Sequence, residues 1–367
     1  MIGWEDVYKV VSAMVPLYVA LGLGYGSIRW WRIFTKEQSE AISRLVSFFT
    51  LPLFTLEFTL HIDPFAMNYR FIAADAVSKL VILLVLAAWA KCNSKGSYCW
   101  TITSFSLSTL TNSLVMGVPL LNAMYGRWAQ DLVVQISVIQ AIVWLTMLLF
   151  VLEVRKSGSM GAMAPHATPS GPPDTDSGGN GGGVVVTIDS MTTKGVVEVG
   201  KKPSLWCLMK IVWLKLAMNP NSYASILGLT WAFIANRWHF EMPAIMEDSV
   251  LIMSKAGTGM AMFSMGLFMA SQEKLITCGP GLTVFSMVLR FVAGPAAMAI
   301  GAIAVGLHGN ILRVAIIQAA LPQSITSFIF AREYGLHADV LSTAVIFGML
   351  VSLPVLVAYY VLLGFLS

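Results

Sequence analysis

The sequence predicts an all-α polytopic membrane protein with ten transmembrane helices. Apolar residues make up 57% of its 367 residues and charged residues only 11%, a composition far outside the range of soluble globular proteins. Apolar stretches of about 20 residues, the length that spans the hydrocarbon core of a bilayer, recur along the chain between short polar segments. These observations place most of the chain in a membrane.

Ten stretches of this kind are predicted to span the bilayer. They cover residues 7–28, 39–60, 70–91, 100–124, 132–152, 219–236, 246–270, 280–306, 312–332 and 338–365. The first stretch lacks the basic segment and the small-residue cleavage site of a signal peptide, so we interpret it as the first span.

A polar segment, residues 153–203, separates the fifth predicted span from the sixth and is rich in Gly, Ser and Pro, as in SGPPDTDSGGNGGG. Such a segment buries too little apolar surface to offset the entropy of ordering, so we expect a disordered loop. It divides the chain into a first five-span unit, 1–152, and a second, 204–367. The second unit begins with a basic amphipathic segment, 204–216, which we expect to lie on the membrane surface.

The two units are predicted to form a 5+5 inverted repeat. An odd number of spans per unit gives related units opposite topology, as in many secondary transporters. Leu110-Thr111-Asn112-Ser113 in the fourth span resembles Leu321-Pro322-Gln323-Ser324 in the ninth, and a Tyr-Gly pair follows each. Lys and Arg concentrate in the connections on the side of the central loop, which places that loop in the cytosol and both termini on the other side.

Polar residues and prolines interrupt the fourth and ninth spans. A helix can be interrupted inside a bilayer only where protein groups or a water-filled cavity satisfy its backbone. We therefore predict that these spans are broken near Thr111, Pro119, Pro322 and Gln323, and that the breaks cross with their helix N-termini facing a bound anion. The alternative is that Pro119 and Pro322 are ordinary kinks in packed helices.

Asp75 and Lys79 lie four residues apart on one face of the third span, with the acid N-terminal to the base, which is the favourable order. Charged residues within a span usually face a cavity or each other, so the pair indicates a polar interior. The alternative is a pair near the membrane surface. Thr55, Gln140 and Gln318 either face the same cavity or bond neighbouring helices.

Signatures of enzymes and metal sites are missing from the sequence. It contains no H-E-x-x-H segment and no P-loop, its five histidines are scattered, and its four cysteines show no C-x-x-C spacing. We therefore expect no enzymatic activity, no cofactor, no metal and no nucleic-acid partner.

Several stretches resemble the plant PIN-FORMED auxin efflux carriers: LSTLTNSLVMGVPLLNAMYG, NPNSYASILGLTWAF, GMAMFSMGLFMA, IIQAALPQSITSFIFAREYGLH and LSTAVIFGMLVSLPVLVAYY. The similarity covers nearly all of both units and fails only in the loop. A loop this short resembles the short-loop members, which reside largely in the endoplasmic reticulum, and the details look most like the fifth family member. The resemblance implies a fold similar to sodium/proton antiporters, elevator-type movement, a homodimer, and indole-3-acetic acid as substrate.

The resemblance also implies a binding site. The substrate carboxylate would be met by Asn112 and by Asn221, whose Asn219-Pro220-Asn221-Ser222 segment is equally consistent with a helix cap. Asp75 and Lys79 match the charged pair of the family beneath the substrate. The remaining pocket positions are Thr55 and Gln140, which are polar, and Val115 and Ile325, which are apolar.

Two departures from the family pattern alter this expectation. Thr111 stands where relatives usually have proline, and after Pro322-Gln323 the usual Gly-Ile-Val-Pro is replaced by residues 324–327, SITS. We expect both changes to affect the geometry of the pocket and its affinity.

The predicted function is secondary transport of the auxin anion, by uniport from the cytosol into the lumen of the endoplasmic reticulum, for intracellular auxin homeostasis. One alternative is a proton-coupled organic-anion carrier at the plasma membrane. Another is a membrane receptor that binds auxin without moving it. Paired broken helices argue against the receptor, because a receptor needs no access from two sides.

Overall fold

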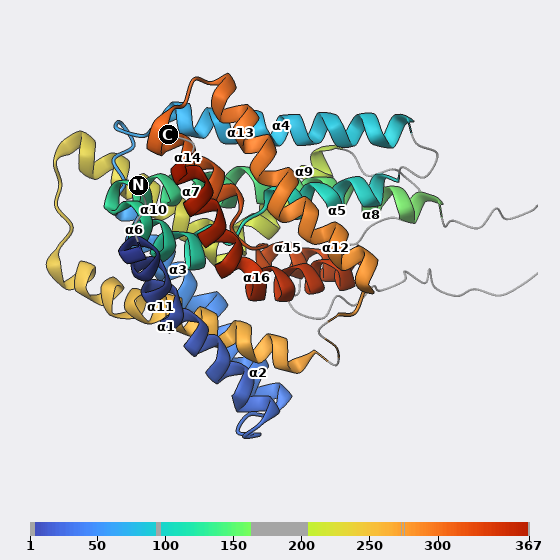
Figure 1. Ribbon diagram of the computed structural model, residues 1–367, viewed down its shortest axis with the longest axis horizontal. Coiled ribbons are helices and arrows are strands. Elements are labelled where there is room, and N and C mark those ends of the chain that lie inside the picture. The colour runs from blue at the N-terminus through green and yellow to red at the C-terminus, as the bar shows by residue number, and fades with distance from the viewer. Residues whose placement is uncertain (1–3, 93–96, 163–204, 273, 275, 366–367) are drawn as a thin grey trace, which may run out of the picture.

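In a computed structural model, each predicted span corresponds to one helix or to consecutive helical segments (Figure 1). The structure describes residues 4–92, 97–162, 205–272, 274 and 276–365. Within these ranges seven helical segments are long and apolar enough to cross a membrane, shorter apolar helices accompany them, and no strand occurs. The all-helical membrane class is therefore confirmed, whereas the count of ten spans and the inverted repeat stay predictions.

The helices follow the predicted boundaries within a few residues in most cases. The first unit contains α1 (Trp4–Arg29), α2 (Lys36–Leu45), α3 (Leu51–Leu60), α4 (Tyr69–Cys92), α5 (Tyr98–Thr109), α6 (Val118–Tyr125), α7 (Arg127–Ile139) and α8 (Leu145–Ala162). The second contains α9 (Leu205–Ala217), α10 (Pro220–Trp238), α11 (Ala244–Ser271), α12 (Pro280–Val288), α13 (Gly294–Ala304), α14 (Gly309–Ala319), α15 (Ile325–Glu333) and α16 (Ala338–Phe365).

Four π-helical turns lie inside the spans: η1 (Val46–Thr50), η2 (Ser113–Gly117), η3 (Gln140–Trp144) and η4 (Leu289–Ala293). Three of them are followed two residues later by a proline, Pro52, Pro119 or Pro295. Proline has no N–H to donate and its ring clashes with the preceding turn, and a widened turn relieves both constraints without ending the helix. Pro119 is therefore a local distortion next to the broken fourth span, and the break itself lies further upstream.

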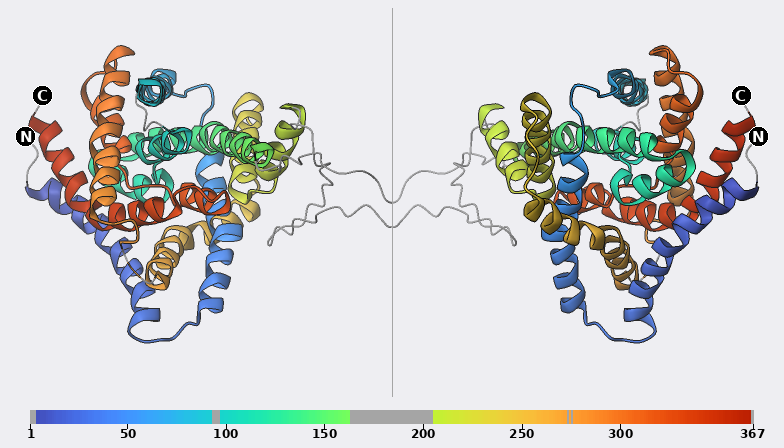
Figure 2. Two further views of the ribbon diagram at one scale, coloured as in Figure 1. Left: turned by 90° about the vertical axis from the view of Figure 1, so that its right-hand side faces the viewer. Right: turned by 90° about the vertical axis from the view of Figure 1, so that its left-hand side faces the viewer.

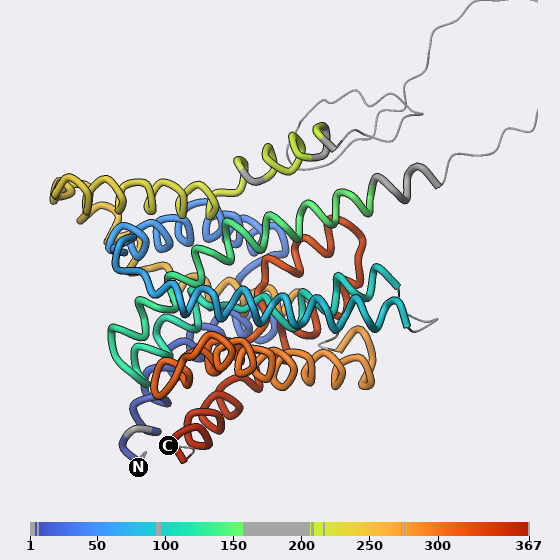
Figure 3. Tube along the Cα trace, turned by 90° about the horizontal axis from the view of Figure 1, so that it is seen from above, coloured from blue at the N-terminus to red at the C-terminus, as the bar shows by residue number. Residues whose placement is uncertain are grey.

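Two sets of helices pack along their lengths. α11 lies between α1 and α3, and α10 packs on α3 (Figure 2). In the other set α13 packs along α4, with α14 and α5 beside them. The start of α1 and the end of α16 lie close together (Figure 3). The axes approach closely at glycines: a Cβ added at Gly301 would lie 2.7 Å from the carbonyl oxygen of Ala74. This contact sets α13 directly against the turn that carries Asp75.

At one end of the bundle, side-chain hydrogen bonds connect α8 and α9, the helices on either side of the central loop. α8 continues to Ala162, so the first ten residues of the predicted loop are helical, and the rest of the loop lies outside the described residues. Lys215 of α9 bonds Glu333 at 2.8 Å and the hydroxyl of Tyr334 at 2.6 Å, and that hydroxyl donates to Glu153 of α8 at 2.6 Å. Burial and the Glu153 carboxylate raise the pKa of Tyr334, so it stays a neutral donor in this cluster.

His337, in the turn between α15 and α16, is expected to make stability depend on pH. Its ring stacks on Trp100 at 4.2 Å between centroids, and its Nδ1 bonds Thr103 at 2.8 Å. Burial, and to a lesser degree the charge of Arg155, lower its pKa below the ordinary value of about 6.5. His337 therefore binds a proton more readily in the unfolded chain than in the folded protein. Its contribution to stability is fully present above about pH 6.5 and is lost as the pH falls below that value.

We expect the thermal midpoint of unfolding to decrease as the pH is lowered from about 7.5 to about 5.5, a range that includes the ordinary pKa of histidine. We expect His337→Asn to make this decrease smaller. Asn tolerates the positive φ of 42° at this position. His239→Asn is a matched control, because His239 is exposed and has a φ of 55°. If His337→Asn and the wild type lose the same number of degrees over this range, His337 is not the group responsible.

Candidate functional site

The fourth and ninth predicted spans are both interrupted, and the two interruptions lie next to each other where the spans cross. α5 ends at Thr109, α14 ends at Ala319, and the extended residues after them pair in one antiparallel bridge between Thr111 and Gln323. The amide of Asn112 donates to the carbonyl of Pro322 at 2.8 Å, and the amide of Ser324 donates to the carbonyl of Leu110 at 3.1 Å. The two breaks thus satisfy part of each other's backbone, as an interruption inside a bilayer requires.

Gln140 bonds the amide and the carbonyl of Thr111, which have no partner within the bridge. Its Oε1 accepts from the Thr111 amide at 3.1 Å, and its Nε2 donates to the Thr111 carbonyl at 2.7 Å. Gln140 is the first residue of η3 and its side chain is buried. Both ends of this carboxamide are therefore engaged with the main chain, so Gln140 supports the crossing, and the second N–H of its NH2 group has no hydrogen bond among the described residues.

A polar network continues from Thr111 to the other broken helix. The Thr111 hydroxyl bonds the Ser113 hydroxyl at 2.5 Å, and Gln318 of α14 donates to the Ser113 hydroxyl at 3.1 Å. Gln323 donates to the carbonyl of Ser106 at 3.1 Å and to the hydroxyl of Ser327 at 2.6 Å. Ser327 belongs to the segment that departs from the family pattern, and here it accepts a hydrogen bond from Gln323 at the second break.

Asn112 differs from these residues because its carboxamide has no hydrogen bond to any residue that the structure describes. It is half-buried and precedes η2, whose first amides lack intrahelical partners. Ser324 occupies the corresponding place before α15. A free amide donor and two helix N-termini therefore lie at the crossing, and this is an arrangement that binds an anion.

Asp75 and Lys79 form an ion pair beside the crossing. Lys79 Nζ lies 2.6 Å from Asp75 Oδ2, and both side chains are almost fully buried, with 3% and 4% exposed. The indole N–H of Trp144 donates to the same carboxylate oxygen at 3.1 Å, and the Lys79 ammonium lies 4.7 Å from the centre of that ring. This pair faces the protein interior and is not exposed at the protein surface.

The π turn η3 joins the pair to the crossing. Gln140 begins this turn and contacts Thr111, and Trp144 ends it and contacts Asp75. One distorted turn thus fixes the positions of both features, which agrees with the frequent occurrence of such turns at functional sites.

Thr55 and Asn221 meet in the other set of helices, where the Thr55 hydroxyl donates to the Asn221 carboxamide oxygen. Asn219 caps α10 by accepting from the amide of Asn221 at 3.1 Å, so the capping interpretation holds for Asn219. The Asn221 side chain is half-buried, and its NH2 group has no hydrogen bond among the described residues. α10 packs on η3, which carries Gln140.

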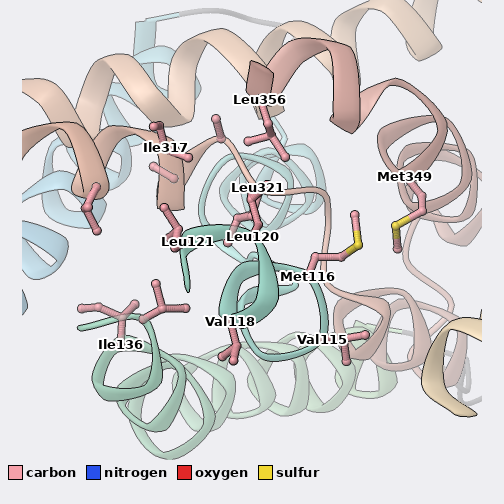
Figure 4. Packing of buried hydrophobic residues seen from close by; sticks show 14 of the residues in the cluster. Val115, Met116, Val118, Leu120, Leu121, Ile136, Ile317, Leu321, Met349 and Leu356 are labelled. Carbon is pink, nitrogen blue, oxygen red and sulfur yellow. The ribbon is translucent and has the colours of Figure 1, made fainter. Parts of the chain in front are cut away.

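Apolar side chains of η2 and α6 pack in one buried cluster with Leu321, which precedes Pro322 at the second break (Figure 4). A Cβ added at Gly117 would lie 2.6 Å from Cδ1 of Leu321, so a larger residue there would displace the Leu321 side chain. Val115 is buried in the same core, and Ile325 packs against that core from the first turn of α15.

Arg290 is the residue that the sequence analysis missed. It lies in η4 with a side chain that is 0% exposed, and it donates to backbone carbonyls at the ends of α5 and α14. It also lines a cavity of about 10 Å³, together with Asp75, Lys79 and Gln318. An arginine in the middle of an otherwise apolar predicted span was the signal that could have identified it.

A family model described as membrane transport protein matches residues 9–360. The chain is 68% identical to auxin efflux carrier component 5 of Arabidopsis thaliana over 366 residues, which is 100% of each chain. It is 64% identical to probable auxin efflux carrier component 5a of Oryza sativa subsp. japonica over 99% of each chain. Identity to auxin efflux carrier component 4 of Arabidopsis thaliana is 31%, in an alignment of 615 positions that exceeds the length of this chain.

Proposed function

Because the chain belongs to the membrane transport protein family and is a transporter of the short-loop auxin efflux carrier type, we propose that it carries the anion of indole-3-acetic acid across a membrane. The observation that carries this proposal is the free carboxamide of Asn112 at the crossing of two broken helices. A weak-acid anion with an indole ring needs a few neutral donors and an apolar wall, since a permanent buried ion pair would hold it too tightly for turnover.

In the proposed binding mode the carboxylate accepts hydrogen bonds from Asn112 and from the helix N-termini at the crossing. Asn221 supplies its free NH2 group from the other set of helices, while Thr55 orients it. Val115 and Ile325 form the apolar wall. Gln140, Thr111, Pro322 and Gln323 hold the crossing, and Asp75 and Lys79 support it from behind.

The proposed mechanism is movement of the set that contains the crossing relative to the set that contains α1, α3, α10 and α11, so that the site opens to each side in turn. The division of the helices into two packed sets supports this. We further propose uniport from the cytosol into the lumen of the endoplasmic reticulum, a homodimer, a cytosolic central loop and non-cytosolic termini. Uptake into proteoliposomes under imposed pH and voltage gradients separates uniport from proton coupling, and co-localisation with a reticulum marker tests the membrane.

Asn112→Ala is expected to lower the apparent affinity for indole-3-acetic acid by roughly 10- to 100-fold, the effect of losing one hydrogen bond to a charged group. The measurement is uptake of the radiolabelled acid by proteoliposomes that contain the purified protein. Asn122→Ala is the matched control, because Asn122 is an exposed asparagine of the neighbouring helix α6. Normal uptake by Asn112→Ala, or an equal loss in both variants, would reject the proposed site, and absence of uptake by the wild type would reject the function.

A further inference from the structure

The guanidinium of Arg290 joins the ends of the two helices that stop at the crossing. Nη1 donates to the carbonyls of Leu107 and Leu110 at the end of α5, each at 3.1 Å. Nη2 donates to the carbonyl of Ala319 at the end of α14, and Nη1 also lies 3.4 Å from Oε1 of Gln323. A single side chain from a third span therefore holds both broken helices.

Its charge suits this position. The last carbonyls of a helix lack intrahelical partners and carry a partial negative charge, so a cation at a helix C-terminus is favourable. Two such ends meet at the crossing. The planar guanidinium has five donors in a fixed fork and can reach carbonyls on both helices at once, whereas the ammonium of lysine is a compact point charge.

No acid among the described residues is paired with the charge of Arg290. Asp75, the acid that lines the same cavity, is engaged with Lys79 at 2.6 Å. An arginine side chain keeps its proton in proteins. One positive charge is thus left in excess inside the membrane, where an unpaired charge is costly.

Resting on the function proposed above, we propose that Arg290 is a positioning residue that makes the transport site select an anion over a neutral molecule of the same shape. Leu110, whose carbonyl it binds, lies only two residues before Asn112. An anion at Asn112 would therefore feel the excess charge at short range in a medium of low dielectric constant, where Coulombic attraction is strong. The guanidinium acts through the helix ends and does not need to touch the substrate.

The test compares the wild type with Arg290→Gln and Arg290→Lys in proteoliposomes. Uptake of radiolabelled indole-3-acetic acid is inhibited either by the unlabelled acid or by indole-3-acetamide, its neutral amide, and the ratio of the two inhibition constants is the anion preference. We expect the wild type to prefer the acid. In Arg290→Gln we expect the ratio of the two inhibition constants to fall by a factor of about ten or more. We expect Arg290→Lys to keep the preference but to have a lower maximal rate, because an ammonium holds both helix ends less well.

Each outcome decides the proposal. A wild type that takes up the acid without preferring it to the amide, or a folded Arg290→Gln with unchanged preference, overturns it. If Arg290→Gln does not fold, Arg290→Lys decides: unchanged preference with a lower rate supports the proposal, whereas a lost preference or an unchanged rate overturns it. A wild type without any uptake would reject the proposed function instead, before the variants are compared.

Discussion

Replacing Asp75 by Asn is expected to destabilise the protein by about 3–5 kcal/mol, the usual cost of removing one partner of a buried ion pair. Lys79 would keep its burial and lose the carboxylate that now lies 2.6 Å from its ammonium. The measurement is the free energy of unfolding from titration with sodium dodecyl sulfate in mixed micelles. We also expect uptake of indole-3-acetic acid to fall, because Trp144 at the end of η3 would donate to a neutral carboxamide oxygen in place of the carboxylate, which is a weaker hydrogen bond.

The control is the double variant Asp75→Asn with Lys79→Met. Removing both charges leaves no unpaired ion in the interior, and replacement of a complete buried pair by neutral side chains is often close to neutral for stability. We expect the double variant to recover most of the lost stability without recovering transport. A single variant as stable as the wild type, or a double variant no more stable than the single one, would show that the pair does not contribute in this way.

Much of this fold could be predicted from the sequence, because its features are local. The length and composition of an apolar stretch give the position of a span, and a polar cluster with proline inside such a stretch indicates a break. Asp75 and Lys79 lie four residues apart, so helical geometry alone places them together. These predictions need no knowledge of which helix packs on which.

The features that could not be predicted depend on packing between distant segments. The hydrogen bonds of Gln140 to the backbone of Thr111 are one example, because no pattern in the sequence shows which main-chain groups a bridge leaves open. Arg290 is a single charge in an apolar stretch, and its role becomes visible only when α5 and α14 end beside it. The helical start of the predicted loop, up to Ala162, follows from continuation of α8 beyond its apolar part.

Gln140→Leu is expected to have the second large effect, a loss of about 2–6 kcal/mol of stability. The side chain keeps a similar size, but the amide and the carbonyl of Thr111 both lose their partner, and each unsatisfied buried group costs about 1–3 kcal/mol. The antiparallel bridge does not compensate, because its hydrogen bonds involve Asn112 and Ser324 instead. Uptake should fall as well, because Asn112 follows directly on Thr111.

Thr111→Pro separates the two contributions, since proline has no amide to leave unsatisfied. Leu110 has φ −89° and ψ 110°, the extended conformation that a residue before proline favours. In the Thr111→Pro background, Gln140→Leu removes a partner only from the carbonyl, and we expect its cost to be smaller by about 1–3 kcal/mol. Unfolding titrations of the four proteins in this cycle measure the difference. Equal costs in both backgrounds would mean that the Thr111 amide gains nothing from Gln140. A reduced cost would show that Gln140 provides the hydrogen-bond partner that the amide at position 111 needs, and that proline, which has no amide hydrogen, does not need one.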